Sequence, residues 1–274
     1  MSTNELTISF ATAREVLAVA IALPVVGILV VSGRSYIRLA NQQKFDIDDW
    51  FIVGSLVLVI GMGASQIYGV SQKAIGYASE PYPSPSPTAE LTELTPKQRV
   101  VELVDWITWV LMVPANGLIK LSTLFLYRRL FFVVRWDLFD ILSLALVVIC
   151  ALWTMSFLFA TIFGCGAHFD YPWGPLAEIG SCNTNMRLDG LMISDLITDI
   201  LVWLVPIPVV WQMKMPITQK LGVTAILMLA AVSLAAAVVR LIVQWQISNG
   251  GYAAHTDVDR KPAIARKAAS LNEY

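Results

Sequence analysis

Long, almost uninterrupted blocks of apolar residues constrain this chain more than any other feature of its sequence. Several blocks approach or exceed the roughly 20 residues that an α-helix needs to cross the hydrocarbon core of a bilayer. The composition agrees, because 57% of the residues are hydrophobic and 14% are charged, whereas a soluble domain is about a quarter charged. We therefore expect an all-α, polytopic transmembrane helix bundle.

Six spans are predicted, separated by polar connections. They cover about residues 16–33, 50–69, 101–127, 138–163, 188–211 and 217–246. Residues 16–247 thus form one transmembrane domain, between an N-terminal segment (1–15) and a polar tail (248–274) that we expect to be disordered. The first block also has the length of a signal-peptide core. The region before it is not basic and no small-residue cleavage site precedes Arg34, so we interpret it as a retained helix.

Two helix starts carry capping residues. An aspartate of Asp46-Ile47-Asp48-Asp49 can accept the free backbone N–H groups that open the second span. Before the third span, Thr95 is followed by Pro96 and Gln98, the pattern of a capping box with proline at the first helical position. Both helices are therefore expected to begin at these residues.

Lysine and arginine predict the orientation, because they gather in short cytoplasmic loops. With the N-terminus outside, the inner loops carry eight basic residues and the longer outer segments carry five. The inner residues are Arg34, Arg38, Lys44, Arg128, Arg129, Arg135, Lys214 and Lys220. We therefore expect an extracellular N-terminus and, most simply, a location in the plasma membrane.

The tail does not fit this topology. After an even number of spans it lies outside, although it carries Arg260, Lys261, Arg266 and Lys267. Either the charge rule is overridden here, or a seventh span is missing from this chain.

Ionisable residues inside the spans are the best pointers to a site, since a charge near the bilayer centre costs about 2.5–3.5 kcal/mol unless it faces protein or water. The candidates for a polar network across three helices are Asn116, Lys120, Asp195, Asp199 and Arg240. Asn116 and Lys120 share one helix face, as do Asp195 and Asp199. Asp195 and Arg240 match in depth, so they are the expected pair. Such pairs either lock helix packing or handle a ligand or protons, and the sequence leaves both open.

Enzyme chemistry is not expected. The two histidines, His168 and His255, lie far apart in a loop and in the tail, so they form no membrane metal site and no His-based triad. We therefore expect no catalytic residue and no metal. The net charge near −1 gives no reason to expect a nucleic-acid partner.

Three short motifs give the chain a family resemblance. They are Asp48-Asp49-Trp50 at the second span, Lys120-Leu121-Ser122 with Tyr127-x-Arg129-Leu130-Phe131 at the third, and Thr198-Asp199 followed by Pro206-Ile207-Pro208 at the fifth. In this order, from about Ser32 to Trp245, the sequence resembles the fungal rhodopsin-domain family, which includes pathogenicity-related proteins similar to G-protein-coupled receptors. The resemblance implies seven helices and an outer N-terminus. The chain departs from it by lacking a predicted seventh helix and a cysteine-rich outer domain.

The cysteines fit one disulfide. Cys165 and Cys182 bracket the outer loop between the fourth and fifth spans, and a bridge would contribute about 3 kcal/mol by loop entropy. The resemblance implies the same arrangement, because the family has a cysteine at each end of this loop and a tryptophan between them. In this chain that tryptophan is Trp173. Two free thiols remain the alternative. Cys150 lies within the fourth span and is expected to be a buried apolar residue.

No cofactor is expected either. Retinal chemistry needs a buried lysine with a carboxylate counter-ion, which Lys120 and Asp199 match superficially. In known rhodopsins that lysine lies on the seventh helix, which is not among the predicted spans.

Two function classes remain. The resemblance favours a receptor-like sensor, in which an extracellular small ligand biases helix packing and basic inner loops address a cytosolic G protein. The alternative is a transporter or accessory membrane protein of secondary metabolism. The lipid bilayer is the expected partner in both.

Overall fold

The computed structural model describes residues 12–42, 44–77, 93–130, 137–166, 168, 170–175, 182, 184–207, 227–228 and 230–242. All regular structure in these ranges is helical, which confirms the predicted all-α fold. Residues 1–11, the tail at 248–274 and its four basic residues lie outside the described part. The chain divides into two units, Met1–Arg135 with Asp140–Cys182, and Trp136–Phe139 with Asn183–Tyr274.

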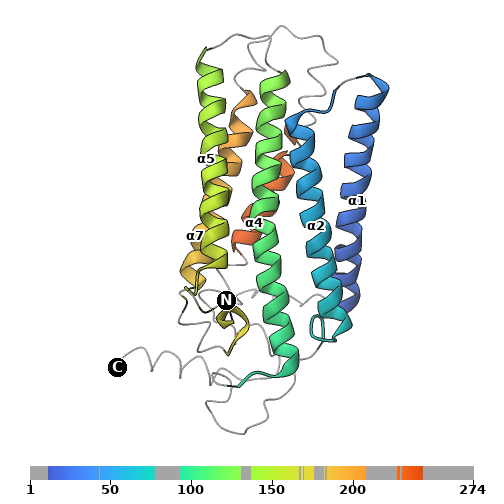
Figure 1. Ribbon diagram of the computed structural model, residues 1–274, viewed down its shortest axis with the longest axis vertical. Helices are drawn as coiled ribbons and strands as arrows, with labels where there is room; N and C mark the ends of the chain where they lie inside the picture. The colour runs from blue at the N-terminus through green and yellow to red at the C-terminus, as the bar shows by residue number, and fades with distance from the viewer. Residues whose placement is uncertain are drawn as a thin grey trace, which may run out of the picture. The chain divides into compact units, whose positions relative to one another are not determined.

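Four long helices build the first unit (Figure 1). They are α1 (Ala13–Ala40), α2 (Ile47–Ser71), α4 (Pro96–Leu130) and α5 (Asp137–Ile162). By length and composition, all four can cross a membrane. They correspond to the first four predicted spans.

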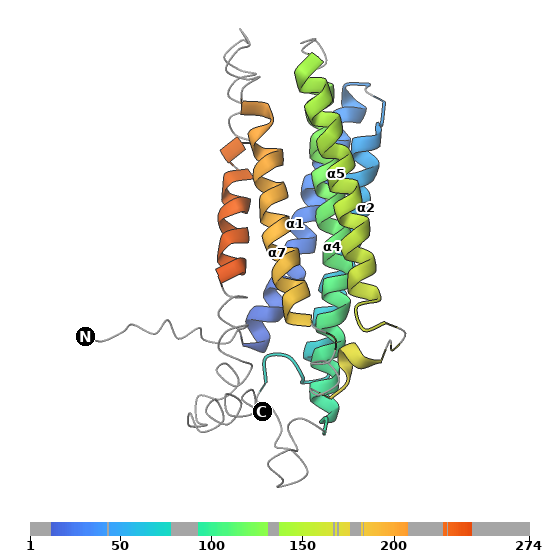
Figure 2. The same ribbon diagram turned by 90° about the vertical axis from the view of Figure 1, so that its left-hand side faces the viewer.

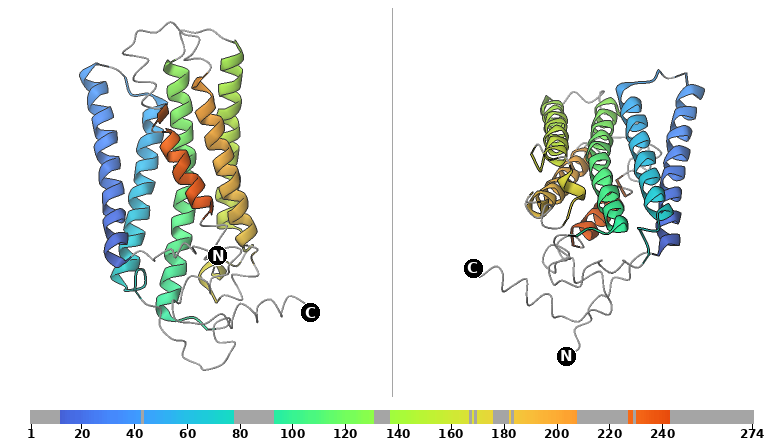
Figure 3. Two further views of the ribbon diagram at one scale, coloured as in Figure 1. Left: turned by 180° about the vertical axis from the view of Figure 1, so that it is seen from behind. Right: turned by 60° about the horizontal axis from the view of Figure 1, so that its bottom comes forward.

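Small residues let these helices approach closely, as packing in lipid requires. α2 lies between α1 and α4 (Figures 1 and 3). A Cβ built on Gly63 of α2 would come within 2.6 Å of the Ala20 carbonyl oxygen of α1. On α4, a Cβ on Gly117 would collide with Thr154 of α5. Glycine is therefore required by close helix contact at both positions.

The disulfide lies beside the N-terminal part of α4. Cys165 and Cys182 are bonded, with Cα atoms 4.8 Å apart, which confirms the predicted bridge. Between them, the short helix η1 (Tyr171–Trp173) packs against α4 (Figure 2). The ring of Trp173 meets that of Trp106 edge-on, with centroids 5.1 Å apart. This contact fixes the loop on the start of α4.

The second unit contains α7 (Thr184–Leu204) and the helix Ala230–Ile242, which lie side by side (Figure 2). The Trp203 indole N–H donates a hydrogen bond of 3.1 Å to the carbonyl oxygen of Leu227. These helices correspond to the fifth and sixth predicted spans. Residues 208–211 of the fifth span, and residues 217–226, 229 and 243–246 of the sixth, lie outside the described residues.

The helix starts agree with the capping patterns. Asp46 accepts the backbone N–H of Ile47 at 2.9 Å, and the Asp49 carboxylate accepts the N–H of Asp46 at 3.1 Å. Thr95 accepts the N–H of Gln98 at 3.2 Å, so α4 begins where its capping box predicts. The end of α1 differs from expectation, because the helix continues to Ala40. Arg34 and Arg38, expected in a loop, therefore lie on a helix.

Candidate functional site

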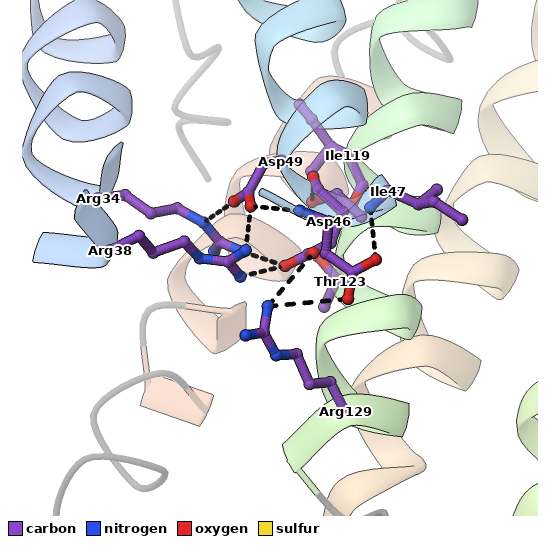
Figure 4. A network of polar contacts seen from close by, with 10 residues as sticks. Arg34, Arg38, Asp46, Ile47, Asp49, Ile119, Thr123 and Arg129 are labelled. Carbon is purple, nitrogen blue, oxygen red and sulfur yellow. Dashed lines mark hydrogen bonds and ion pairs between the residues drawn. The ribbon is translucent and has the colours of Figure 1, made fainter. Parts of the chain in front are cut away.

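Arginine and aspartate side chains from three helices meet at one end of the first unit (Figure 4). Arg34 and Arg38 come from the last turns of α1, Asp48 and Asp49 from the first turn of α2, and Arg129 from the last turn of α4. We call these five residues the charge cluster. The two arginines of α1 are four residues apart, so they project from one face of the helix.

The two aspartates are almost fully buried, and each forms ion pairs with both arginines of α1. Arg38 pairs with Asp49, and its Nη2 lies 2.6 Å from Asp48 Oδ2. Arg34 pairs with Asp48, and its Nε lies 3.1 Å from Asp49 Oδ1. The exposed fractions of the aspartate side chains are 2% and 5%. Each carboxylate thus has two guanidinium partners, which compensates the loss of its hydration.

Arg129 is held more loosely than the other two arginines. Its Nη1 lies 3.9 Å from Asp46 Oδ2 and 4.0 Å from Asp48 Oδ1. Both distances exceed the range of about 2.7–3.2 Å in which N–H groups form hydrogen bonds. Its side chain is 36% exposed. Arg129 therefore neutralises charge at the edge of the cluster without being locked into it.

A hydrogen bond also joins α4 to the start of α2. The Ser122 hydroxyl donates to the backbone carbonyl oxygen of Asp48 at 2.8 Å. With Asp46, the cluster and its surroundings hold three guanidinium and three carboxylate groups, so the site is neutral as a whole. Replacing one partner of such a buried pair typically costs 3–5 kcal/mol, because the other charge is left uncompensated.

The predicted intramembrane network falls into both units. In the second, the Arg240 Nη2 lies 3.1 Å from Oδ2 of the buried Asp195. In the first, the Nζ of the buried Lys120 sits 4.5 Å from the ring centroid of Trp153, a cation–π contact. Asn116 and Asp199 are both partly exposed. The pairing of Lys120 with the α7 aspartates stays a prediction.

The remaining motif residues have separate places. Tyr127 is buried, Trp50 is exposed, and Leu121 is partly exposed on α4. Pro206 is fully buried, and Pro208 lies outside the described residues. Within the described ranges, no group of three or more His, Cys, Asp and Glu residues could hold a metal ion.

Sequence reasoning missed the charge cluster because it used Arg34 and Arg38 as loop charges that set orientation. The spacing of these two arginines, followed by the adjacent Asp48 and Asp49, was the available signal. The turn between α1 and α2 brings these two arginines and two aspartates together. The ends of the apolar blocks, from which the spans were predicted, do not show this.

The fold and the site together define a multi-pass α-helical membrane protein whose helices are joined by buried ion pairs. Residues 33–260 match the fungal rhodopsin domain, so this chain belongs to the fungal rhodopsin-domain family. The motif residues Asp48, Asp49, Ser122 and Arg129 meet at one place in the structure, which gives the resemblance a physical basis.

Part of the chain is similar to one curated fungal protein. The chain is 33% identical over 102 residues to "Phomoidride biosynthesis cluster protein H" of Fungal sp. (strain ATCC 74256). The alignment covers 36% of this chain and 34% of that protein, so the chain spans about a third of its relative's length. No solved structure matches the chain.

Proposed function

We propose that this protein is a non-catalytic, receptor-like membrane sensor. Its N-terminus faces outward in the plasma membrane, and its arginine-rich end faces the cytosol. A small extracellular ligand acts near the loop tied by Cys165 and Cys182. The response appears at the charge cluster, where a cytosolic G protein would bind.

The observation that carries this proposal is the engagement of α4 at both ends. Near its start, Trp106 packs on Trp173 of the disulfide-tied loop. Near its end, Arg129 reaches Asp46 and Asp48. At 1.5 Å per residue, these two positions on α4 are about 35 Å apart along the helix.

Pro114 lies between the two ends of α4. A proline inside a helix removes one backbone hydrogen bond and permits a kink there. A change in the bend at Pro114 would move Arg129 relative to the aspartates of α2. The long Arg129 contacts support this role, because a loosely held ion pair can rearrange at low cost.

The experiment that tests the proposal measures G-protein binding directly. Purified protein in lipid nanodiscs is titrated with GDP-bound fungal Gα subunits, and binding is followed by fluorescence anisotropy. We expect the wild-type protein to bind Gα. The Arg129→Gln variant should have a different affinity for Gα, and the Arg128→Gln variant should have the affinity of the wild type. If the protein bound none of the fungal Gα subunits, this result would contradict the receptor function.

The biosynthesis-cluster relative favours a second candidate, a transporter or accessory membrane protein of secondary metabolism. Here the buried Asp195–Arg240 pair would serve a proton or substrate route. Deletion of the gene separates the candidates. A transporter predicts that a secondary metabolite accumulates inside the cells, whereas a sensor predicts changed transcription with an unchanged ratio of intracellular to extracellular product.

A further inference from the structure

An open groove of about 820 Å³ lies beside the charge cluster, between α1 and the end of α4. Its walls combine apolar side chains with three guanidinium groups. The lining residues are Leu29, Val30, Gly33, Arg34, Ile37, Arg38, Leu126 and Arg129. The apolar residues Leu29, Val30 and Leu126 precede the arginines on their helices, so the groove is apolar toward the membrane interior and basic toward its end.

The lining of this groove carries positive charge without a carboxylate. Asp48 and Asp49 neutralise the arginines from the α2 side, but neither lines the groove. Arg34 uses Nε and Nη2 for the aspartates, and its Nη1 has no acceptor among the described residues. The Arg129 guanidinium makes no hydrogen bond within the described part of the chain, since its two carboxylate contacts are 3.9 and 4.0 Å long. Two arginines that line the groove, Arg34 and Arg129, therefore keep guanidinium donors that the aspartates do not use.

We propose that this groove binds one anionic phospholipid from the leaflet at the arginine-rich end. One acyl chain lies along Leu29, Val30 and Leu126, and the headgroup phosphate receives hydrogen bonds from Arg34 and Arg129. Arginine is suited to this task, because its planar fork matches the geometry of phosphate oxygens. Basic pockets between transmembrane helices are a recurrent form of anionic-lipid recognition.

The exposure of the groove wall favours a lipid as its occupant. Leu29 and Val30 are 67% and 61% exposed on a helix that can cross the membrane, so acyl chains are what surrounds them there. In the orientation proposed above, the arginine-rich end meets the cytoplasmic leaflet, which carries the anionic lipids of the cell. The site does not depend on G-protein signalling and would exist equally in an accessory protein.

The test uses delipidated full-length protein in detergent, titrated with dioleoyl-phosphatidylserine or dioleoyl-phosphatidylcholine and followed by native mass spectrometry. We expect one tightly bound phosphatidylserine and weaker binding of phosphatidylcholine, because the choline cation offsets the phosphate charge and would lie close to the arginines, whereas phosphatidylserine keeps a net negative charge. Arg129→Gln should lower phosphatidylserine affinity about fivefold, the usual contribution of one basic residue near a membrane surface. Excess inorganic phosphate should not displace the lipid, because a free anion lacks the acyl contacts.

Two further variants complete the design. Arg128→Gln is the matched control, since Arg128 pairs with Asp140 at 2.8 Å and does not line the groove. Gly33→Phe fills the groove, because a Cβ at Gly33 meets nothing within 4 Å. It should lower phosphatidylserine binding while the size-exclusion profile stays monodisperse. Equal losses in Arg128→Gln and Arg129→Gln, no loss in Arg129→Gln, or equal affinity for both lipids would each overturn the proposal. A dimer that Gly33→Phe dissociates would assign the groove to a second copy and overturn it as well.

Discussion

Ser122 donates a hydrogen bond of 2.8 Å to the backbone carbonyl oxygen of Asp48, 74 residues earlier in the chain. This bond joins two of the motifs that carry the family resemblance. The side chain of Asp48 receives Arg34 and Arg38 from α1 at the same time. The start of α2 therefore connects α1 and α4 through polar contacts to both helices.

Replacing Ser122 with alanine should lower the free energy of unfolding by about 1 kcal/mol, the usual net value of one hydrogen bond. Thr123→Ala provides the control, because the Thr123 hydroxyl bonds to Ile119 within its own helix. Thermal unfolding in detergent, followed by tryptophan fluorescence, measures the difference. Equal effects of the two substitutions would show that the bond between α4 and α2 adds no stability.

Arg38→Gln should be much more damaging than Arg128→Gln. Arg38 is buried and bonds two buried carboxylates, so its loss should cost about 3 kcal/mol. The Arg128–Asp140 pair is exposed on the Asp140 side, and such pairs contribute about 0–1 kcal/mol. Unfolding midpoints of the two variants in the same detergent test this ranking. Similar midpoints would contradict the structural importance of the charge cluster.

Alanine substitutions at two helical glycines should differ in their effect on stability. Gly117→Ala should destabilise the protein by about 1–3 kcal/mol, because the added Cβ collides with Thr154 of α5. Gly33→Ala should be neutral or stabilising by up to about 1 kcal/mol, since alanine favours helices and meets no neighbour there. The yield of monodisperse protein and the unfolding midpoint report both effects. A Gly117→Ala variant as stable as wild type would mean that α4 and α5 are not in close contact.

Loss of the Cys165–Cys182 bridge should lower stability by about 3 kcal/mol, the loop-entropy value for a closed loop of this size. Cys165→Ser tests this, and Cys150→Ala serves as the cysteine control because Cys150 is buried and takes no part in the disulfide. Non-reducing peptide mapping should recover the two loop cysteines as one linked species. Recovery of both as separate peptides would rule out the bridge.

Charge reversal tests the pair in the second unit. Asp195→Lys and Arg240→Glu should each reduce surface expression, because each leaves two like charges facing one another in the second unit. The double variant restores opposite charges and should recover expression, measured by flow cytometry of an N-terminally tagged protein, since the proposed orientation places the N-terminus outside the cell. Without rescue, the two residues would not act as a pair.

The sequence predicted the helical class, four of the spans and the disulfide, because each depends on local pattern. Apolar length indicates a transmembrane helix wherever it occurs, and the capping residues Asp46 and Thr95 are read directly from neighbouring positions. The ends of the helices were predicted less accurately. α1 passes beyond its apolar block to Ala40 because the charges on its last turns are neutralised by Asp48 and Asp49.

The charge cluster was less accessible to sequence reasoning. Asp48, Asp49 and Arg129 all belong to the family motifs, but Arg129 lies more than 70 positions after the two aspartates, and the motifs do not show that these residues meet. Hydropathy reports whether a residue tolerates lipid and does not report which charges will neutralise it. The Asp195–Arg240 pair was expected from depth, since two helices inserted side by side place residues at equal levels opposite each other.

The neutralisation of Arg34 and Arg38 by Asp48 and Asp49 has a consequence for biogenesis. When α1 leaves the ribosome, Arg34 and Arg38 are unpaired cations, and cationic residues beside a helix hold that side in the cytosol during insertion. Their aspartate partners emerge later, with α2, and acidic residues have little influence on topology. In the orientation proposed above, the same two arginines can therefore direct insertion first and be neutralised afterwards. Because α1 is synthesised before α2, the effect of Arg34 and Arg38 on insertion precedes their contacts with Asp48 and Asp49.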